Sequence, residues 1–400
     1  MASMQPTDEH ACPVAGVVLL LFGVAGAILR PRNTPAWVAP TIAAVVGVAI
    51  GTVPHPGSLL RPLAAPIAFL LIAVPLAVLL DRVGFFAAAA QVLGQGRHLA
   101  LGLWVLGAAV TTILNLDAAV VLLTPLYVRI ARRCGLDPLA LAFQPVLLSC
   151  LASSALPVSN LTNLIAASAR HLHTTDFIAH LGPPSLAATT VGWFAYRTAV
   201  HPGIPPTPET GAADRHALAI GGAVVAAVLV GFVVGPGVGI HEWVVALAAD
   251  VVLVGVTCHL PGRDIPWGTA LVAASLGLLA GGAAAHLGLD RLLAGSGNLD
   301  LLRITAVSAV GANVVNNLPA LLVALPHADA GIWALMLGVN VGPLILVTGS
   351  LAALLWQASL ARLGVPVTAA QFAGVGIRVL MPAMAAAFVI LVAFRPLVGG

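Results

Sequence analysis

Residues 99–133 read LALGLWVLGAAVTTILNLDAAVVLLTPLYVRIARR, two apolar arms separated by the polar tip Asn115-Leu116-Asp117. A transmembrane helix needs about 20 apolar residues, and each arm is shorter than that. Four arginines flank the arms: Arg97, Arg129, Arg132 and Arg133. A single crossing would place them on opposite faces of the membrane, whereas a segment that enters and returns keeps all four on one face. The stretch therefore predicts a re-entrant helical hairpin over residues 98–133.

A second stretch of the chain has the same shape. The apolar arm Ile304–Val315 is followed by the polar pair Asn316-Asn317 and by a short returning arm. This pattern predicts a second hairpin over residues 301–329. Non-helical backbone at membrane depth is tolerated only where protein buries it or where it lines a cavity. We therefore expect both tips inside the protein, close to the middle of the bilayer.

The composition is that of a polytopic membrane protein. Of 400 residues, 60% are hydrophobic and only 8% are charged, and the mean hydropathy is +1.05. A net charge of +3 with no basic patch excludes a nucleic-acid binder, and four scattered cysteines exclude a disulfide scaffold. All 17 basic residues are arginine, so chemistry that needs a lysine is excluded as well.

The remaining hydrophobic segments divide the chain into two halves with matching layouts. Each half has three scaffold spans, an amphipathic interfacial helix, a hairpin, a broken span and a final span. In the first half, 1–200, these parts are predicted at 14–80, 81–95, 98–133, 139–169 and 183–200. In the second half, 217–400, they are predicted at 217–284, 286–297, 301–329, 332–360 and 374–394. A proline-rich cytoplasmic linker, 201–216, joins the halves.

This layout predicts an all-α membrane protein with ten spans and two hairpins. Five crossings per half invert the second half relative to the first. Inverted repeats whose discontinuous helices meet near the midplane are typical of secondary transporters. The layout puts eleven of the 17 arginines on the cytoplasmic side and five outside, in agreement with the positive-inside rule. We expect a multi-pass protein of the cell (inner) membrane with both termini outside.

Four polar islands, two per half, interrupt the apolar sequence. They supply the candidate substrate-binding residues: Asn115; Ser159, Asn160, Thr162 and Asn163; Asn316 and Asn317; Thr348, Gly349 and Ser350. Pro157 precedes one island and Pro343 another, so we expect helix breaks there. Unwound backbone, amides and hydroxyls suit a small hydroxylated solute or a hard cation. Alternatively, these side chains only satisfy the broken backbone.

Asp117 is the acidic residue at the first tip. An ionised aspartate at the centre of a bilayer costs about 2.5–3.5 kcal/mol on insertion scales, and such residues mark ion or proton pathways. We therefore assign proton coupling to Asp117. A proton moving down 100 mV supplies about 2.3 kcal/mol, roughly a fifty-fold solute gradient. The alternative is that Asp117 caps the returning helix at its N-terminus, and the two roles can coexist.

The islands carry a resemblance to a known family. ILNLDAAVVLLTPLYVRIARR (113–133) and SSALPVSNLTNLIAA (153–167) resemble the first hairpin and broken span of the arsenite/antimonite efflux permeases. GANVVNNLPALLVAL (311–325) and NVGPLILVTGSLAALLWQ (340–357) resemble the second pair. These permeases belong to the ion transporter superfamily, which includes sodium-coupled dicarboxylate carriers. The family usually has Asn-Asp-Gly at the first tip, where this chain has Asn115-Leu116-Asp117.

The resemblance implies a function and a set of partners. It implies an elevator-type movement of a hairpin-bearing domain against a scaffold. It also implies export of arsenite and antimonite, driven by protons and in some members assisted by a soluble ATPase. Related carriers form homodimers through the scaffold. Arsenious acid is neutral at pH 7, so exchange for protons would use the membrane potential.

Other functions remain open at this point. A sodium/proton antiporter fits, because Asp117 with Asn115 and Asn316 could coordinate sodium. A sodium-coupled carrier of an organic anion fits less well, since a carboxylate at the tip would repel the anion. A membrane protease is disfavoured because His241-Glu242 lacks the second histidine of a zinc motif. We expect no enzyme activity, no metal site and no cofactor.

Two further sets of residues have structural interpretations. Asp250 lies in the middle of an apolar span, and Arg378 in the last span is its expected partner in a structural ion pair. The cysteines are Cys12, Cys134, Cys150 and Cys258, which we interpret as ordinary small apolar residues and not as a thiol trap.

Overall fold

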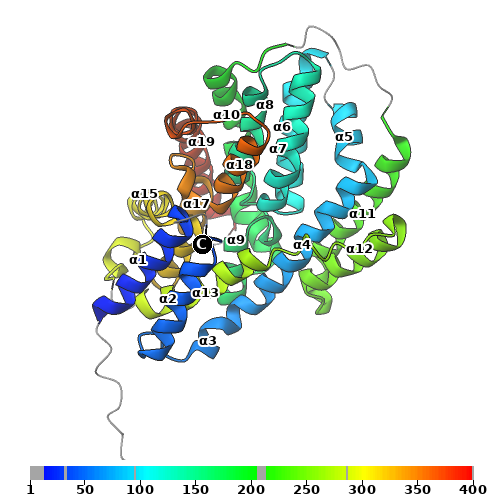
Figure 1. Ribbon diagram of the computed structural model, residues 1–400. Coiled ribbons are helices and arrows are strands. Elements are labelled where there is room, and N and C mark those ends of the chain that lie inside the picture. Colours follow the sequence, from blue (N-terminus) through cyan, green and yellow to red (C-terminus); the bar gives the residue numbers. More distant parts are fainter. Residues whose placement is uncertain (1–12, 31–33, 94–95, 205–212, 285–286, 399–400) are drawn as a thin grey trace, which may run out of the picture.

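The computed structural model describes residues 13–30, 34–93, 96–204, 213–284 and 287–398. All regular structure in these ranges is helical, which confirms the predicted all-α class (Figure 1). Half of the predicted linker 201–216, residues 205–212, lies outside the described residues, as do both chain ends. Three helices are long and apolar enough to cross a membrane: Pro56–Val83, Arg215–Val234 and Ala369–Arg395.

One group of helices consists of α1 (Pro13–Leu29), α2 (Val38–Ala49) and α13 (Trp267–Ala284), which pack on one another. Small residues allow this contact. A Cβ at Gly26 would overlap the side chain of Ala39, so α1 and α2 approach backbone to backbone. The apolar faces of the three helices form one buried cluster.

A second group forms around α4 (Ala64–Val83), which packs along α12 (Glu242–Thr257) and α11 (Arg215–Val234). Figure 1 shows α11 and α12 on the side of the molecule opposite α1 and α2, whereas α4 runs from α3 (Pro56–Leu60) across to them. The predicted interfacial helix 81–95 is divided in the structure. α4 continues to Val83, Gly84 turns the chain at φ +85°, and α5 follows over Phe85–Leu93.

Two pairs of helices are each joined by a tight turn. The first is α6 (Leu99–Ile113) with α7 (Leu116–Arg133). The second is α15 (Asn298–Val315) with α16 (Asn317–Ala324), which packs on α13. The helices of each pair turn at the predicted polar tips, because Asn115 and Asn316 lie outside helical geometry.

Two segments follow these pairs, and each is a helix, a short 3-10 helix and a second helix. Their bounds are α8 (Pro138–Leu151), η4 (Pro157–Ser159) and α9 (Leu161–Arg170), then α17 (Ile332–Val341), η7 (Val347–Gly349) and α18 (Leu351–Arg362). α7 lies against both α8 and α18, so the two halves of the chain interleave here.

The long helices α10 (Thr174–Val200) and α19 (Ala369–Val398) pack along each other outside the broken segments. α10 begins nine residues before the predicted span 183–200. Its internal Pro183 and Pro184 do not end the helix, since membrane helices tolerate proline.

In the predicted interfacial segment 286–297, the described residues 287–297 contain one short helix, α14 (Asp290–Leu293), before α15 begins. His327, after α16, forms a hydrogen bond to Asp290 at 2.7 Å. This contact holds the pKa of the Asp290 carboxyl below its ordinary value. Arg303 on α15 donates to the carbonyls of Leu292 and Ala294, so the segment is fastened to the second hairpin.

Candidate functional site

Each of the four polar islands lies at the start of a helix. The residues that precede these helices are Asn115 for α7, Asn160 for α9, Asn316 for α16 and Ser350 for α18. Each side chain accepts a backbone N–H: from Asp117 at 2.8 Å, Thr162 at 3.2 Å, Leu318 at 3.3 Å and Ala353 at 3.1 Å, respectively. These N-caps satisfy backbone donors that a helix start leaves unpaired. The positive ends of four helix dipoles therefore lie at the islands.

Asp117 lies in the first turn of α7, directly after the cap residue Asn115. Its residue is partly buried, and its Oδ1 is buried without a hydrogen-bond partner. A carboxylate in this position is favoured by the helix dipole but still has an unused acceptor. The atom is thus free to accept a hydrogen bond from a ligand or to hold a proton.

The first break is tied to α17 by Asn340. The Oδ1 atom of Asn340 accepts from Asn160 Nδ2 at 3.1 Å and from Thr162 Oγ1 at 2.8 Å. Its Nδ2 donates to Asn163 Oδ1 at 2.7 Å. All four residues are at most 3% exposed. The three predicted site residues of α9 therefore contact one another through a residue of the second half.

Asn163 extends this network into the unwound backbone, donating to the carbonyls of Ser153 at 2.8 Å and Leu156 at 2.9 Å. Ser159 and Thr112 connect the break to the first hairpin. Ser159 Oγ donates to the Thr112 carbonyl at 2.7 Å, and Thr112 Oγ1 donates to the Ala152 carbonyl at 2.8 Å. The first break is thus hydrogen-bonded to α6 of the first hairpin through Thr112, three residues before Asn115.

The second break is held mainly by backbone groups. Asn316 Nδ2 donates to the Thr348 carbonyl at 3.0 Å. Asn313 on α15 donates to the Gly342 carbonyl at 2.9 Å and accepts the N–H groups of Ile345 at 3.1 Å and Leu346 at 3.0 Å. Gly349, a predicted site residue, has no side chain to contribute, and a Cβ there would lie 2.9 Å from Pro343 Cβ.

Three hydroxyls near the first tip and first break remain without partners. The Oγ atoms of Ser153 and Ser154 and the Oγ1 of Thr111 are buried and make no hydrogen bond. Ser153 and Ser154 are fully buried in the unwound chain between α8 and η4. Buried polar groups normally have partners, so these atoms mark a place where a polar ligand or water can bind.

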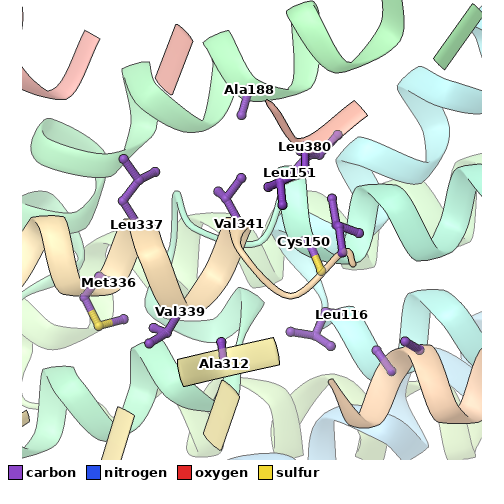
Figure 2. Packing of buried hydrophobic residues seen from close by; sticks show 14 of the residues in the cluster. Leu116, Cys150, Leu151, Ala188, Ala312, Met336, Leu337, Val339, Val341 and Leu380 are labelled. Atoms are coloured by element: carbon purple, nitrogen blue, oxygen red, sulfur yellow. The ribbon is translucent and has the colours of Figure 1, made fainter. Parts of the chain in front are cut away.

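Apolar side chains surround the network. Figure 2 shows Leu116 of the first tip, Ala312 of α15, Cys150 of α8 and Val341 of α17 around the end of α17, all within one buried cluster. Cys150 Sγ lies 3.8 Å from the Pro343 carbonyl. Cys134 and Cys150 belong to different buried clusters, and Cys258 is exposed. The described residues contain no cluster of three or more metal-binding side chains.

Residues 13–353 match the protein family described as Citrate transporter. The match covers most of the chain and includes both hairpins and most of both broken segments. The chain belongs to the citrate transporter family. It is accordingly a multi-pass membrane transporter.

Several relatives of this citrate transporter family member are named arsenical pump membrane protein. One from Escherichia coli is 28% identical over 355 residues, covering 77% of this chain and 81% of the relative. One from Yersinia enterocolitica is 28% identical over 350 residues with the same coverage. The protein of Escherichia coli strain K12 is 26% identical over 418 aligned positions, covering 93% of this chain and 96% of the relative. These matches confirm the resemblance carried by the four islands.

The expected ion pair between Asp250 and Arg378 is absent from this family member. Asp250 Oδ1 is buried and makes no hydrogen bond. Its helix α12 and the helix of Arg378, α19, lie on opposite sides of the molecule (Figure 1). The sequence-based interpretation was wrong, because α12 packs on α4 and α11, whereas α19 packs on α10.

Sequence reasoning missed Asn340 and Asn313. Each is an isolated amide within an apolar helix, outside the islands, yet each makes at least three hydrogen bonds at a break. The sequence did carry a signal, since each asparagine lies inside an apolar helical segment. A polar side chain in such a position needs hydrogen-bond partners. Applied to this citrate transporter family member, the same reasoning would have added Asn313 and Asn340 to the candidate site residues.

Proposed function

We propose that this protein exports arsenite and antimonite as neutral trihydroxides in exchange for protons. The supporting observation is that amides and hydroxyls lie at four helix starts, with a single carboxyl group, Asp117, among the island residues. Relatives named arsenical pump membrane protein point to the same solutes. The candidate substrate-binding residues remain those of the four islands, joined now by Ser153 and Ser154.

The chemistry of the network suits a neutral trihydroxide. Each O–H of such a solute can donate to an acceptor, and each oxygen can accept from a hydroxyl. The ionised Asp117 carboxylate is the strongest acceptor available. A proton on Asp117 removes that charge and releases the solute. Solute and proton then bind alternately, which is the requirement for exchange.

We propose the same overall arrangement that the sequence predicts: two inverted repeats, ten spans and an elevator movement. The packing pattern supports it. α4 of the first half lies against α11 and α12, and α13 of the second half lies against α1 and α2. These six helices form the proposed scaffold. We also propose an inner-membrane location with both termini outside, a homodimer and a soluble ATPase partner. These proposals are supported by the arginine counts and by the family resemblance.

An organic anion such as citrate is the second candidate substrate, because the matched family carries that description. The site argues against it. The four islands contain no arginine or histidine, and Asp117 would repel a carboxylate. Sodium is a further alternative, since Asp117 and Asn115 offer oxygen ligands to a hard cation.

Everted membrane vesicles provide the test. Uptake of radiolabelled arsenite is measured with respiration on, then with a proton uncoupler, for the native chain and for Asp117→Asn. The matched control is Asp250→Asn, which changes the other acid buried in a membrane helix outside the network. We expect uptake that collapses with uncoupler and in Asp117→Asn but persists in Asp250→Asn.

Equal uptake in Asp117→Asn and the native chain would reduce Asp117 to a helix cap. If arsenite does not accumulate while citrate or sodium does, the proposed substrate is wrong. The thermal unfolding temperature of each purified variant separates loss of coupling from loss of folding.

A further inference from the structure

A cavity of about 320 Å³ lies where α8, α10 and α19 meet, away from the polar network. Its apolar lining includes Leu139 and Phe143 of α8, Val200 of α10 and Val375 of α19. Two charged residues complete it, Asp137 at the start of α8 and Arg378 on α19. The cavity thus combines apolar walls with one positive and one negative group.

Arg378 is nine residues into α19, about 14 Å along the helix axis. Its side chain is exposed and makes neither a hydrogen bond nor an ion pair with any residue that the structure describes. An unpaired guanidinium within an apolar helix is costly unless a ligand or water takes its five donors. Arg378 therefore offers an open binding site for an anionic group.

Asp137 is the counterpart of Arg378 in the cavity. One carboxylate oxygen caps α8 by accepting the Leu139 N–H at 3.0 Å. Among the described residues, no ion pair joins Asp137 to a cation, although Arg378 lines the same cavity. A ligand that carried only negative charge would meet the Asp137 carboxylate. A ligand with one phosphate and one ammonium would match both groups.

The cavity lies at the end of α10 that contains Val200 and at the end of α19 that contains Ala370, where we expect these helices to reach the head groups of adjacent lipid. α10 and α19 carry exposed apolar side chains, among them Leu186 (70% exposed) and Met381 (62% exposed). The cavity is at the end of the molecule where Arg132 of α7 donates to the Leu363 carbonyl. This arginine-rich end is the one predicted to face the cytoplasm.

We infer that this cavity binds the head group of phosphatidylethanolamine from the adjacent leaflet. The phosphate contacts Arg378, the ammonium contacts Asp137, and the glycerol and first acyl carbons lie against Phe143 and Val375. The site is separate from the transport network, so the proposal stands independently of the transported solute.

A second cavity at the other end of α10 and α19 provides an internal comparison. It has a similar charge pattern, with Asp329 and Arg395 in its lining. There, both charged side chains already interact with other groups of the protein. Arg170 forms an ion pair with Asp329 at 2.5 Å, and Arg395 donates to the Ser296 carbonyl. We therefore place a lipid only at the Arg378 cavity.

Native mass spectrometry of the delipidated full-length protein provides the test, with titration of phosphatidylethanolamine or phosphatidylglycerol. We expect the native chain to bind one phosphatidylethanolamine more tightly than phosphatidylglycerol. Arg378→Gln should weaken phosphatidylethanolamine binding about fivefold, the loss of one charge-assisted contact. Asp137→Asn should abolish the preference for phosphatidylethanolamine. Arg362→Gln, an exposed arginine at the end of α18 outside the cavity, should change neither.

Two outcomes would overturn the inference. The first is equal phosphatidylethanolamine binding by Arg378→Gln, Arg362→Gln and the native chain. The second is a native preference for phosphatidylglycerol, which would mean that the cavity reads only negative charge. Each variant should have the same unfolding temperature as the native chain, so that a change in lipid binding is not caused by unfolding.

Discussion

At the scale of residues, Asn340 joins the second half of the chain to the first. It bonds to Asn160, Thr162 and Asn163 in a buried site. Hydrogen bonds between membrane helices contribute about 0.6 kcal/mol on average and up to about 1.7. We therefore expect a double-mutant cycle of Asn340→Ala with Thr162→Val to give a coupling energy of about 0.6–1.7 kcal/mol. The measurement is the free energy of unfolding in detergent.

The control cycle combines Asn340→Ala with Thr198→Val, an exposed hydroxyl on α10 that bonds only to Ala195 of its own helix. That pair should be additive. If the Thr162 cycle is also additive, the network does not couple the halves energetically. The sequence placed polar residues at the four islands, but it could not show that Thr162 bonds to Asn340, because the two are 178 positions apart.

At the scale of elements, close packing of α15 on α17 depends on Gly338 and Gly342. A Cβ at Gly338 would lie 2.5 Å from the Thr305 carbonyl oxygen and 2.6 Å from Ser308 Cβ. Gly338→Ala should therefore separate the two helices and destabilise the protein by about 1–3 kcal/mol, measured as a lower unfolding temperature. Gly222→Ala on α11, where no atom lies within 4 Å of the added carbon, should leave the temperature unchanged or raise it. Equal effects of the two changes would contradict this account of the interface.

The sequence predicted helix breaks well and helix lengths less well. The breaks coincide with Pro157 and Pro343, since an amide nitrogen without hydrogen leaves the ladder interrupted. The predicted span 183–200 lies within α10, whose helix begins nine residues earlier and continues through Pro183 without a break. Local sequence alone does not distinguish a proline that ends a helix from one that neighbouring helices support.

At the scale of the whole molecule, the elevator proposal predicts which cross-links are tolerated. α13 faces the second hairpin, and Leu276 and Val315 line one small gap between them. In a cysteine-free background, bridging Leu276→Cys to Val315→Cys with a short bifunctional thiol reagent should stop arsenite uptake into vesicles. Uptake should return when the bridge is reduced.

The matched control joins two proposed scaffold helices. Thr41 Oγ1 and Ser275 Oγ lie 3.1 Å apart between α2 and α13, so cysteines at these positions can be bridged without distortion. This bridge should leave uptake intact. Transport that survives the Leu276–Val315 bridge would mean that the hairpins and α13 move together, and the elevator arrangement would be wrong.

The residues of the second break take part in hydrogen bonds mainly through their main-chain groups. A mutational scan changes only side chains. Thr348 offers its carbonyl oxygen to Asn316, and Gly349 ends η7 where Ser159 ends η4. A peptide carbonyl is common to every amino acid, so replacing the residue leaves that polar group in place. Substitutions in the first break should therefore change the specificity for the solute more often than substitutions in the second break. A library that diversifies residues 153–163 and keeps 342–350 fixed should therefore yield more altered specificities than the reverse design.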